Sequence, residues 1–241
     1  MSGPGGSGRD RAPSPVRSRR WLAVLVLLSA AGLAGGVTWA LLGSGLFAVR
    51  SVVVTGTRLV PESEVLSAAD IRPGTPLIRV DTAQIAARVL TITQIQGVEV
   101  STSWPDRVVI AVRERTPALA VVAPDGFDLI DAYGVVVQLA QARPATLPIY
   151  TTSGPVSSLR GDPDVSAAAA VLGELPAWLR PAVTSVAAPG PDQVTLQLRN
   201  GVTVVWGGPG AAAAKTKELA ILMATPARYY DVSSPATAVT S

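Results

Sequence analysis

An uncharged stretch near the N-terminus constrains this chain more than any other feature of its sequence. Residues 21–49 contain 29 positions without Asp, Glu, Lys or Arg, and the most apolar part, 21–42, covers 22 of them. A helix of that length is about 33 Å long at about 1.5 Å per residue. The hydrocarbon core of a bilayer is about 30 Å thick. We therefore expect residues 21–43 to form a single transmembrane helix.

The charges that flank this stretch predict its orientation. Residues 1–20 contain five arginines and one aspartate, whereas the first charge after the stretch is Arg50. Cytoplasmic flanks carry the excess of Arg and Lys, so we expect a cytoplasmic N-terminus and an extracytoplasmic C-terminus at the cell membrane. Trp21 and Trp39 lie near the two ends, where indole rings favour the headgroup layer. Residues 1–20 lack apolar periodicity and are expected to be a disordered tail.

A cleaved signal peptide is the alternative interpretation of this segment. Signal peptides have an apolar region of about 7–15 residues followed by a small-x-small cleavage site. The apolar run here is longer, and Gly43-Ser44-Gly45 is a weak match to such a site. The sequence favours an uncleaved anchor.

Composition excludes several classes of function. The chain has no Cys and no His, which removes thiol nucleophiles, thiolate metal sites, His-based triads and His-containing zinc sites. No Ser-x-x-Lys motif occurs, so we expect no catalysis and no cofactor. The formal charge is +3 in total, and residues 1–20 alone contribute a net +4, which leaves −1 for the remainder. A nucleic-acid-binding domain would carry its positive charge on the folded part.

Residues 47–115 predict the order strand, helix, helix, strand, strand. The expected elements are 49–55, 61–69, a helix capped by Asp81, 98–103 and 107–114. Val65, Leu66 and Ala69 have core-facing spacing in the first helix, as do Ile85, Val89 and Ile92 in the second. Trp104 is expected to pack at a hairpin corner, and Glu114 to be a solvated charge at a strand end.

Residues 117–241 predict a mixed β domain with an antiparallel sheet and flanking helices, so the fold class is α+β. A three-stranded meander over 119–138 is followed by a helix from Asp162, a strand over 183–188 and a hairpin over 193–206. After Gly207-Gly208-Pro209-Gly210, a helix is expected over 211–224 with Leu219, Leu222 and Met223 facing the sheet. Lys215 and Lys217 are expected to be solvated. The segment 229–241 is β-prone.

The register of the hairpin follows from its apolar residues. A three-residue loop, Arg199-Asn200-Gly201, pairs Leu198 with Val202, Leu196 with Val204 and Val194 with Trp206, which places six apolar side chains on one face. A two-residue Asn-Gly loop would mix apolar and polar residues on each face. We therefore expect the longer loop, with Gly201 in a left-handed conformation.

The spacing of Asp125, Asp128 and Asp131 suggests a cation site, but turn chemistry explains it better. Asp125 and Asp131 stand at turn starts, where Asp accepts hydrogen bonds from the backbone just ahead. A calcium loop would need more oxygen ligands in one continuous segment. We expect no metal site here.

Several segments resemble one family in the correct order. They are a Pro-Glu-x-Glu-Val helix start, Gly-Thr-Pro-Leu-Ile-Arg-Val-Asp at 74–81, Gly-Val-Glu-Val at 97–100 and Trp-Pro-Asp-Arg-Val-Val-Ile-Ala-Val-Arg-Glu-Arg-Thr-Pro at 104–117. This succession resembles the POTRA domain of the FtsQ/DivIB family of bacterial cell-division proteins. The glycine-rich break, the following helix and Tyr-x-Asp-Val resemble the end of that family's β domain.

The resemblance implies a bitopic scaffold of the divisome, located at the septum. It would bind FtsB/DivIC-like and FtsL-like partners, with other division proteins as further partners of the POTRA domain, and link assembly to septal peptidoglycan synthesis. Relatives bind the FtsB-type partner by strand addition at the last strand and the preceding helix. The corresponding residues here are Lys215, Leu219, Tyr229, Tyr230, Asp231, Val232, Ala236, Thr237, Ala238, Val239 and Thr240. Pro235 and small residues depart from the larger polar ones often found in the final strand.

Two other classes of protein compete with this interpretation. One is a membrane-anchored extracytoplasmic hydrolase, which would need a Ser/Lys or paired-carboxylate site. The other is a POTRA module of a secretion or envelope-assembly system, in which several repeats precede a barrel. A single POTRA-like segment without a barrel-sized remainder favours the division scaffold.

Overall fold

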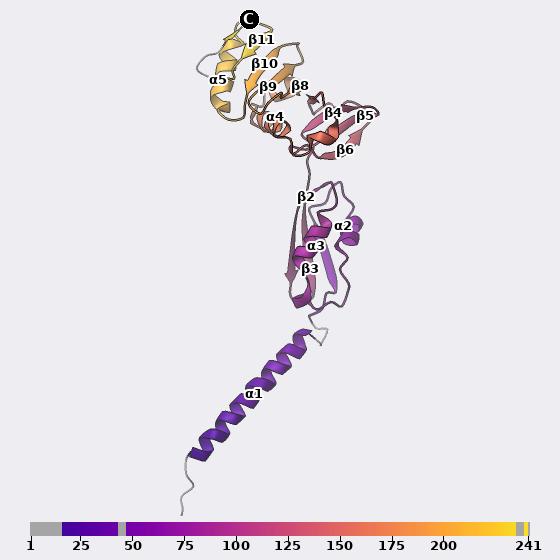
Figure 1. Ribbon diagram of the computed structural model, residues 1–241, viewed down its shortest axis with the longest axis vertical. Coiled ribbons are helices and arrows are strands. Elements are labelled where there is room, and N and C mark those ends of the chain that lie inside the picture. Colours follow the sequence, from indigo (N-terminus) through magenta and orange to yellow (C-terminus); the bar gives the residue numbers. More distant parts are fainter. Residues whose placement is uncertain (1–15, 43–46, 235–238, 241) are drawn as a thin grey trace, which may run out of the picture.

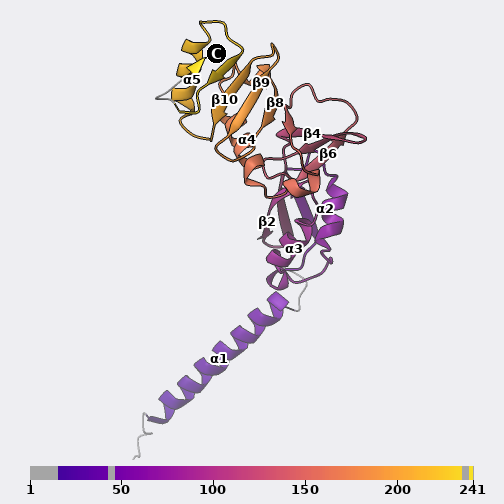
Figure 2. The same cartoon turned by 45° about the horizontal axis from the view of Figure 1, so that its top comes forward.

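The computed structural model describes residues 16–42, 47–234 and 239–240. A long helix, a small domain and a larger sheet domain follow one another along the chain (Figures 1 and 2). The predicted α+β class is confirmed: each domain combines a sheet with helices.

The N-terminal helix, α1, covers Val16–Leu42. It begins inside the segment predicted to be a disordered tail, because Arg17, Arg19 and Arg20 are good helix formers. Residues 1–15, the rest of that predicted tail, lie outside the described residues. Within α1, Trp21–Trp39 has a mean hydropathy of 2.0 and packs against nothing else in the structure. It is the one helix among the described residues that is long and apolar enough to span a membrane.

The first domain follows the predicted order of elements. These are β1 (Ser51–Thr55), α2 (Glu62–Ala69), the short 3-10 helix η1 (Leu77–Arg79), α3 (Thr82–Val89), β2 (Ile95–Ser103) and β3 (Arg107–Glu114). The strand order is β1-β3-β2, with β1 parallel and β2 antiparallel to β3. As predicted, Val108, Ile110 and Val112 of β3 are buried.

The two helices of this domain begin where the sequence predicts. Pro61 precedes α2, whose first turn holds Glu62 and Glu64. The Asp81 side chain caps α3 by accepting a hydrogen bond from the Gln84 backbone N–H at 2.9 Å. Leu66 was expected in the core, but it is 37% exposed. An eight-residue helix resting on a sheet buries only a narrow stripe, here through Val65 and Ala69.

Glu114 corrects a prediction, because its carboxylate is not a solvated strand end. It accepts hydrogen bonds from the backbone N–H groups of Arg58, Leu59 and Val60 at 2.8–3.0 Å. Burial acts to raise the pKa of Glu114, but the three N–H donors outweigh it, and the pKa lies below its ordinary value of 4.5. Glu114 therefore fixes the loop between β1 and α2 from the end of β3.

The second domain contains a nine-stranded mixed sheet. Its strands are β4 (Leu119–Ala123), β5 (Gly126–Ile130), β6 (Val136–Ala140), β7 (Ile149–Thr151), β8 (Val183–Ala187), β9 (Val194–Leu198), β10 (Thr203–Gly207), β11 (Tyr229–Asp231) and β12 (Val239–Thr240). The order across the sheet is β12-β11-β10-β9-β8-β7-β4-β5-β6. The principal helices are α4 (Pro163–Glu174) and α5 (Ala212–Leu222), with 3-10 turns η2 (Val156–Leu159) and η3 (Arg180–Ala182).

The helices connect parallel strands. α4 lies between β7 and β8 in the sequence, α5 lies between β10 and β11, and both strand pairs are parallel. α4 begins where the sequence predicts, and the Asp162 side chain caps it by accepting from the Asp164 N–H at 2.8 Å. The core contains residues from both helices and the sheet, with Trp206, Leu196 and Leu219 fully buried.

The hairpin of β9 and β10 confirms most of the predicted register. Leu196 pairs with Val204, and the Leu198 N–H donates to the Val202 carbonyl at 2.8 Å. Gly201 has φ +80°, so the left-handed prediction is confirmed. The predicted pairing of Val194 with Trp206 is wrong, because a bulge between Val205 and Gly207 brings Gly207 opposite Val194. Trp206 remains fully buried.

Among the described residues, one ion pair joins the two domains. The Arg115 guanidinium, directly after β3, lies 2.6 Å from the Asp131 carboxylate, which follows β5. Arg115 also donates to the Thr93 carbonyl at 2.9 Å. The other Asp131 oxygen accepts from the N–H groups of Tyr133 and Val135. Asp131 thus caps a turn, as predicted, and also contacts the first domain.

Candidate partner-binding edge

The candidate site is the end of the sheet formed by β10, β11 and β12. β11 pairs with β10 in parallel, with Tyr229 opposite Thr203 and Asp231 opposite Val205. The bonds continue past β11, since the Val232 N–H donates to the Val205 carbonyl at 2.9 Å. β12 is antiparallel to β11 and is the outermost strand on this side. The backbone of its outer side has no neighbour among the described strands.

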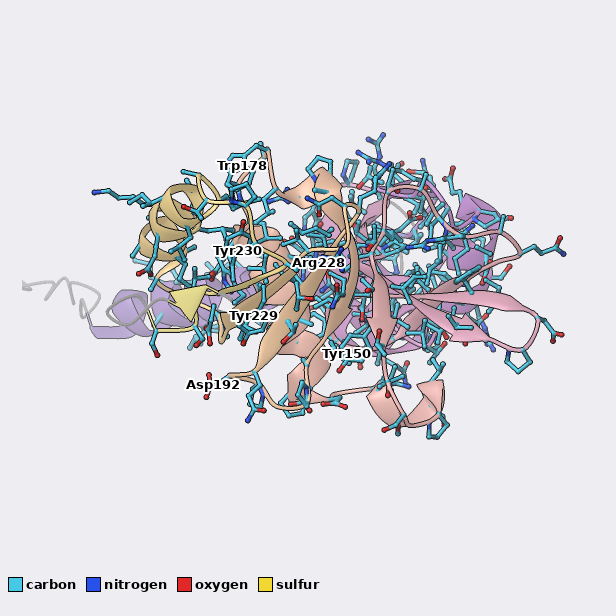
Figure 3. All side chains as sticks on the ribbon, turned by 90° about the horizontal axis from the view of Figure 1, so that it is seen from above. Tyr150, Trp178, Asp192, Arg228, Tyr229 and Tyr230 are labelled. Atoms are coloured by element: carbon cyan, nitrogen blue, oxygen red, sulfur yellow. The ribbon has the colours of Figure 1, made fainter. Side chains whose placement is uncertain are left out.

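Side chains along β11 alternate between buried positions and positions that a partner could contact. Tyr230 and Val232 are buried at 2% and 0% exposure, whereas Tyr229 and Asp231 are half-buried. Arg228, Tyr229 and Tyr230 lie together at this end of the sheet (Figure 3). Asp231 accepts a hydrogen bond from the Ser233 N–H at 2.9 Å and so shapes the chain as it leaves β11. On β11 itself, Tyr229 and Asp231 offer side-chain surface, and Arg228 directly before the strand is exposed.

Tyr230 holds the connection from α5 to β11. Its hydroxyl donates to the Thr225 carbonyl at 2.9 Å and accepts from the Ala227 N–H at 2.9 Å. The ring is buried, so a single side chain ties the turn after α5 to the core. Tyr230 therefore fixes the start of β11 relative to the core and to the end of α5.

Lys215 corrects a prediction, since it is buried at 4% exposure and not solvated. Its Nζ donates to the Gly208 carbonyl at 2.7 Å and lies 5.8 Å from the centre of the Trp206 ring. Burial lowers the pKa of Lys215, while Glu174 and Asp192 act to raise it. The aliphatic stem packs inward, as long cationic side chains often do, and the ammonium satisfies a loop carbonyl. Leu219 is buried at 0% exposure.

The glycine-rich loop after β10 allows close packing under this edge. Gly207 has φ +77°, and a Cβ there would lie 2.9 Å from the Ser233 Cβ. A Cβ on Gly208 would lie 2.3 Å from the Asp192 carboxylate. The Gly210 N–H donates to the Glu174 carboxylate at 2.9 Å. The lack of side chains at Gly207 and Gly208 thus allows the loop to lie close to Ser233 and Asp192. The hydrogen bond to Glu174 fixes the loop just before α5.

The predicted site residues therefore fall into three groups. Backbone at the edge is contributed by Tyr229, Tyr230, Asp231, Val239 and Thr240. Lys215, Leu219 and Val232 are buried and support it from within. Ala236, Thr237 and Ala238 lie outside the described residues.

Reasoning from the sequence missed Glu174 of α4, which accepts a hydrogen bond from the Gly210 N–H, and Asp192 of the turn before β9, which lies close to Gly208. Their distance in sequence from residues 207–210 gave no local signal. The run of three glycines was the available clue, because close backbone approach favours glycine.

Comparison with known proteins identifies both domains. Residues 47–115 match the FtsQ-type POTRA domain, and residues 120–233 match the C-terminal domain of the cell division protein FtsQ/DivIB. A solved extracytoplasmic domain of DivIB from Geobacillus stearothermophilus also matches, with 17% identity, 37% of this chain and 76% of that chain covered, and a TM-score of 0.28.

Curated relatives match most of the chain. The cell division protein FtsQ of Mycobacterium leprae is 36% identical over 98% of this chain and 67% of its own length. That of Mycolicibacterium smegmatis is 37% identical over 79% of this chain and 56% of its own. That of Streptomyces collinus is 36% identical over 92% of this chain and 90% of its own. With matching domains in the matching order, the chain belongs to the FtsQ/DivIB family of bacterial cell-division proteins.

Proposed function

We propose that this single-pass division protein is a non-catalytic scaffold that binds an FtsB/DivIC-like partner by strand addition at β12, and an FtsL-like partner in the same assembly. The observation that carries the proposal is the position of β12 at the end of a nine-stranded sheet. An edge strand offers unpaired N–H and C=O groups to an extended segment. The partner would thereby be linked to septal peptidoglycan synthesis.

The side chains around the edge support backbone recognition. Lys215, Leu219 and Val232 are buried, so their role in binding would be to hold the edge in place. Tyr229 and Asp231 would contact the partner beside the added strand. Most of the affinity would then come from the main-chain ladder.

The proposed topology places the N-terminus in the cytoplasm and both domains outside, at the division septum. The arginines before Trp21 and the uncharged flank after Trp39 support it. A reporter fused after Ser241 should be active only if it functions outside the cytoplasm. Activity of a cytoplasm-specific reporter would contradict this topology.

A pair of substitutions at one position tests strand addition. Ala238→Pro removes a backbone donor and disfavours strand pairing, whereas Ala238→Gly keeps the N–H. We expect the Pro variant, and deletion of residues 236–241, to abolish capture of the FtsB-like partner by the full-length protein in membranes. The Gly variant should retain most of the capture. Undiminished capture by both the Pro variant and the deletion would move the interface away from β12.

A further inference from the structure

Large apolar and cationic side chains gather at the end of the POTRA domain where the chain arrives from α1. We call this surface the anchor-side end and define it by Phe47, Ile78, Arg79, Trp104 and Arg107. Trp104 is 51% exposed and Ile78 57% exposed, and both arginines are exposed. Single exposed apolar residues are ordinary, but a tryptophan and an isoleucine beside two arginines form a mixed surface.

The topology of the domain brings these residues together. Phe47 precedes β1, and Ser51 of β1 pairs with Arg107 at the start of β3. Trp104 lies in the loop between β2 and β3, and its ring packs edge-on against Phe47 with 5.2 Å between ring centres. η1 joins this group because the Leu77 N–H donates to the Phe47 carbonyl at 2.8 Å. Three separate segments thus meet at one end of the sheet.

Covalent geometry places this end close to the membrane surface. The span Trp21–Trp39 has 19 residues, about 28 Å as a helix, which is close to the thickness of the hydrocarbon core. α1 continues to Leu42, so its end lies in the headgroup layer. From Leu42 to Phe47 there are five Cα–Cα steps, which span at most about 18 Å. The Phe47 Cα therefore lies within that distance of the end of the helix, and Trp104 packs directly against the Phe47 ring.

We infer that the anchor-side end rests on the phospholipid headgroups of the adjacent leaflet. Trp104 and Ile78 enter the interfacial layer, where amphipathic rings are favoured, and Arg79 and Arg107 contact lipid phosphates. Trp39, 69% exposed near the end of the span, lies in the same layer. The membrane thereby contacts the protein twice, once through α1 and once through the POTRA domain. This inference goes beyond the division function and does not depend on which partner binds β12.

The absence of cysteine in the chain allows a matched pair of probes. Ile78→Cys introduces a single thiol at the anchor-side end, and a thiol-reactive fluorophore is attached to it. Leu59→Cys places it at the opposite end of the same domain, near Glu114, and Leu59 is 56% exposed. The full-length protein is reconstituted in vesicles of phosphatidylcholine and phosphatidylglycerol that contain headgroup-spin-labelled lipid. We expect several-fold stronger quenching at position 78 than at position 59.

A tether alone would also hold position 78 near the bilayer, so a second comparison separates tethering from contact. A flexible Gly-Ser insertion after Gly45 lengthens the connection. With lipid contact, quenching at position 78 should survive the insertion and fall after Trp104→Ser is added. Equal quenching at positions 78 and 59, or quenching that falls with the insertion alone, would overturn the inference. Quenching at position 78 that is unchanged by Trp104→Ser would also overturn the inference.

Discussion

The POTRA domain and the far edge of the β domain hold their chain segments in opposite ways. In the POTRA domain, a single carboxylate, Glu114, receives three consecutive N–H groups of the loop before α2. At the far edge, only two residue pairs join β12 to β11 among the described residues. The first region is fixed by charged side chains acting on backbone. The second depends on a few backbone hydrogen bonds between β11 and β12, beside the buried residues Lys215, Leu219 and Val232.

This difference teaches where a scaffold can accept a partner. A loop whose donors are already satisfied offers little to an incoming strand. An outer strand retains one side of its hydrogen-bonding groups for exchange with a partner. The Arg115–Asp131 pair joins the POTRA domain to the turn after β5, a strand near the opposite end of the sheet from β12. Changes at each of the three places should therefore have separable effects.

The largest expected effect on stability comes from breaking the Arg115–Asp131 ion pair, which we call the junction. Asp131→Ala removes the partner of a largely buried guanidinium and leaves two N–H groups without their acceptor. We expect the free energy of unfolding to fall by about 3 kcal/mol, because breaking a buried pair leaves an uncompensated charge. Urea denaturation of the solubilised full-length protein measures it.

Asp128→Ala on β5 is the control for this change, because Asp128 is half-buried on the preceding strand. Its expected cost is below about 0.5 kcal/mol. Equal losses in the two variants would show that the junction does not stabilise the protein. Partner capture at β12 should persist in both under native conditions if the edge is independent of the junction.

The next effect tests the support under the edge. Gly207 and Gly201 have similar positive φ angles, +77° and +80°, but a Cβ on Gly207 would contact Ser233, whereas one on Gly201 meets nothing within 4 Å. Gly201→Ala should cost about 1 kcal/mol from backbone strain alone. Gly207→Ala should cost about 2 kcal/mol, because crowding adds to the strain.

The two glycine variants should also differ in binding. Gly207→Ala shifts Ser233 at the end of β11, so we expect weaker capture of the FtsB-like partner than with Gly201→Ala. Equal destabilisation and equal capture would show that the close approach of Gly207 to Ser233 is unimportant for the edge.

The smallest effect concerns pH and the POTRA loop. The pKa of Glu114 is lowered in the folded protein, so its ionised form stabilises the fold above the ordinary value of 4.5. This contribution is lost as the pH falls through the folded-state pKa. Glu114→Gln should cost about 1 kcal/mol at neutral pH, a value reduced by solvent access to the loop.

The same variant should flatten the decline of stability with acid below pH 4.5. Denaturation curves at a series of acidic pH values for the wild type and Glu114→Gln would detect this. An identical acid dependence in both proteins would contradict the role assigned to Glu114.

Local rules predicted much of the fold. Alternation in β3, the Asp81 and Asp162 caps and the apolar face of the hairpin each depend on neighbouring residues, and each is present in the structure. The family resemblance supplied the order of domains. Strand order in the β domain, with β7 between β4 and β8, could not be derived from the sequence, because it depends on long-range pairing.

The errors share a physical cause. Glu114 and Lys215 both carry charge, and the sequence predicts both to be solvated. In the structure each meets backbone groups more than six positions away: the N–H groups of residues 58–60 for Glu114 and the Gly208 carbonyl for Lys215. Such contacts leave no periodic pattern. The bulge before Gly207 was also missed, because it interrupts the alternation from which the register was derived.

The sheet order also sets a sequence of events during biogenesis. β11 and β12 follow every other described strand along the chain, yet they form the terminal pair of the sheet. β11 needs β10 as a template, and β10 needs β9, so this edge is completed only after the rest of its half of the sheet has been synthesised. A chain arrested before β11 would present β10 at that end instead of the pairing surface of β12. Recruitment through β12 would therefore report that synthesis has proceeded through the sheet.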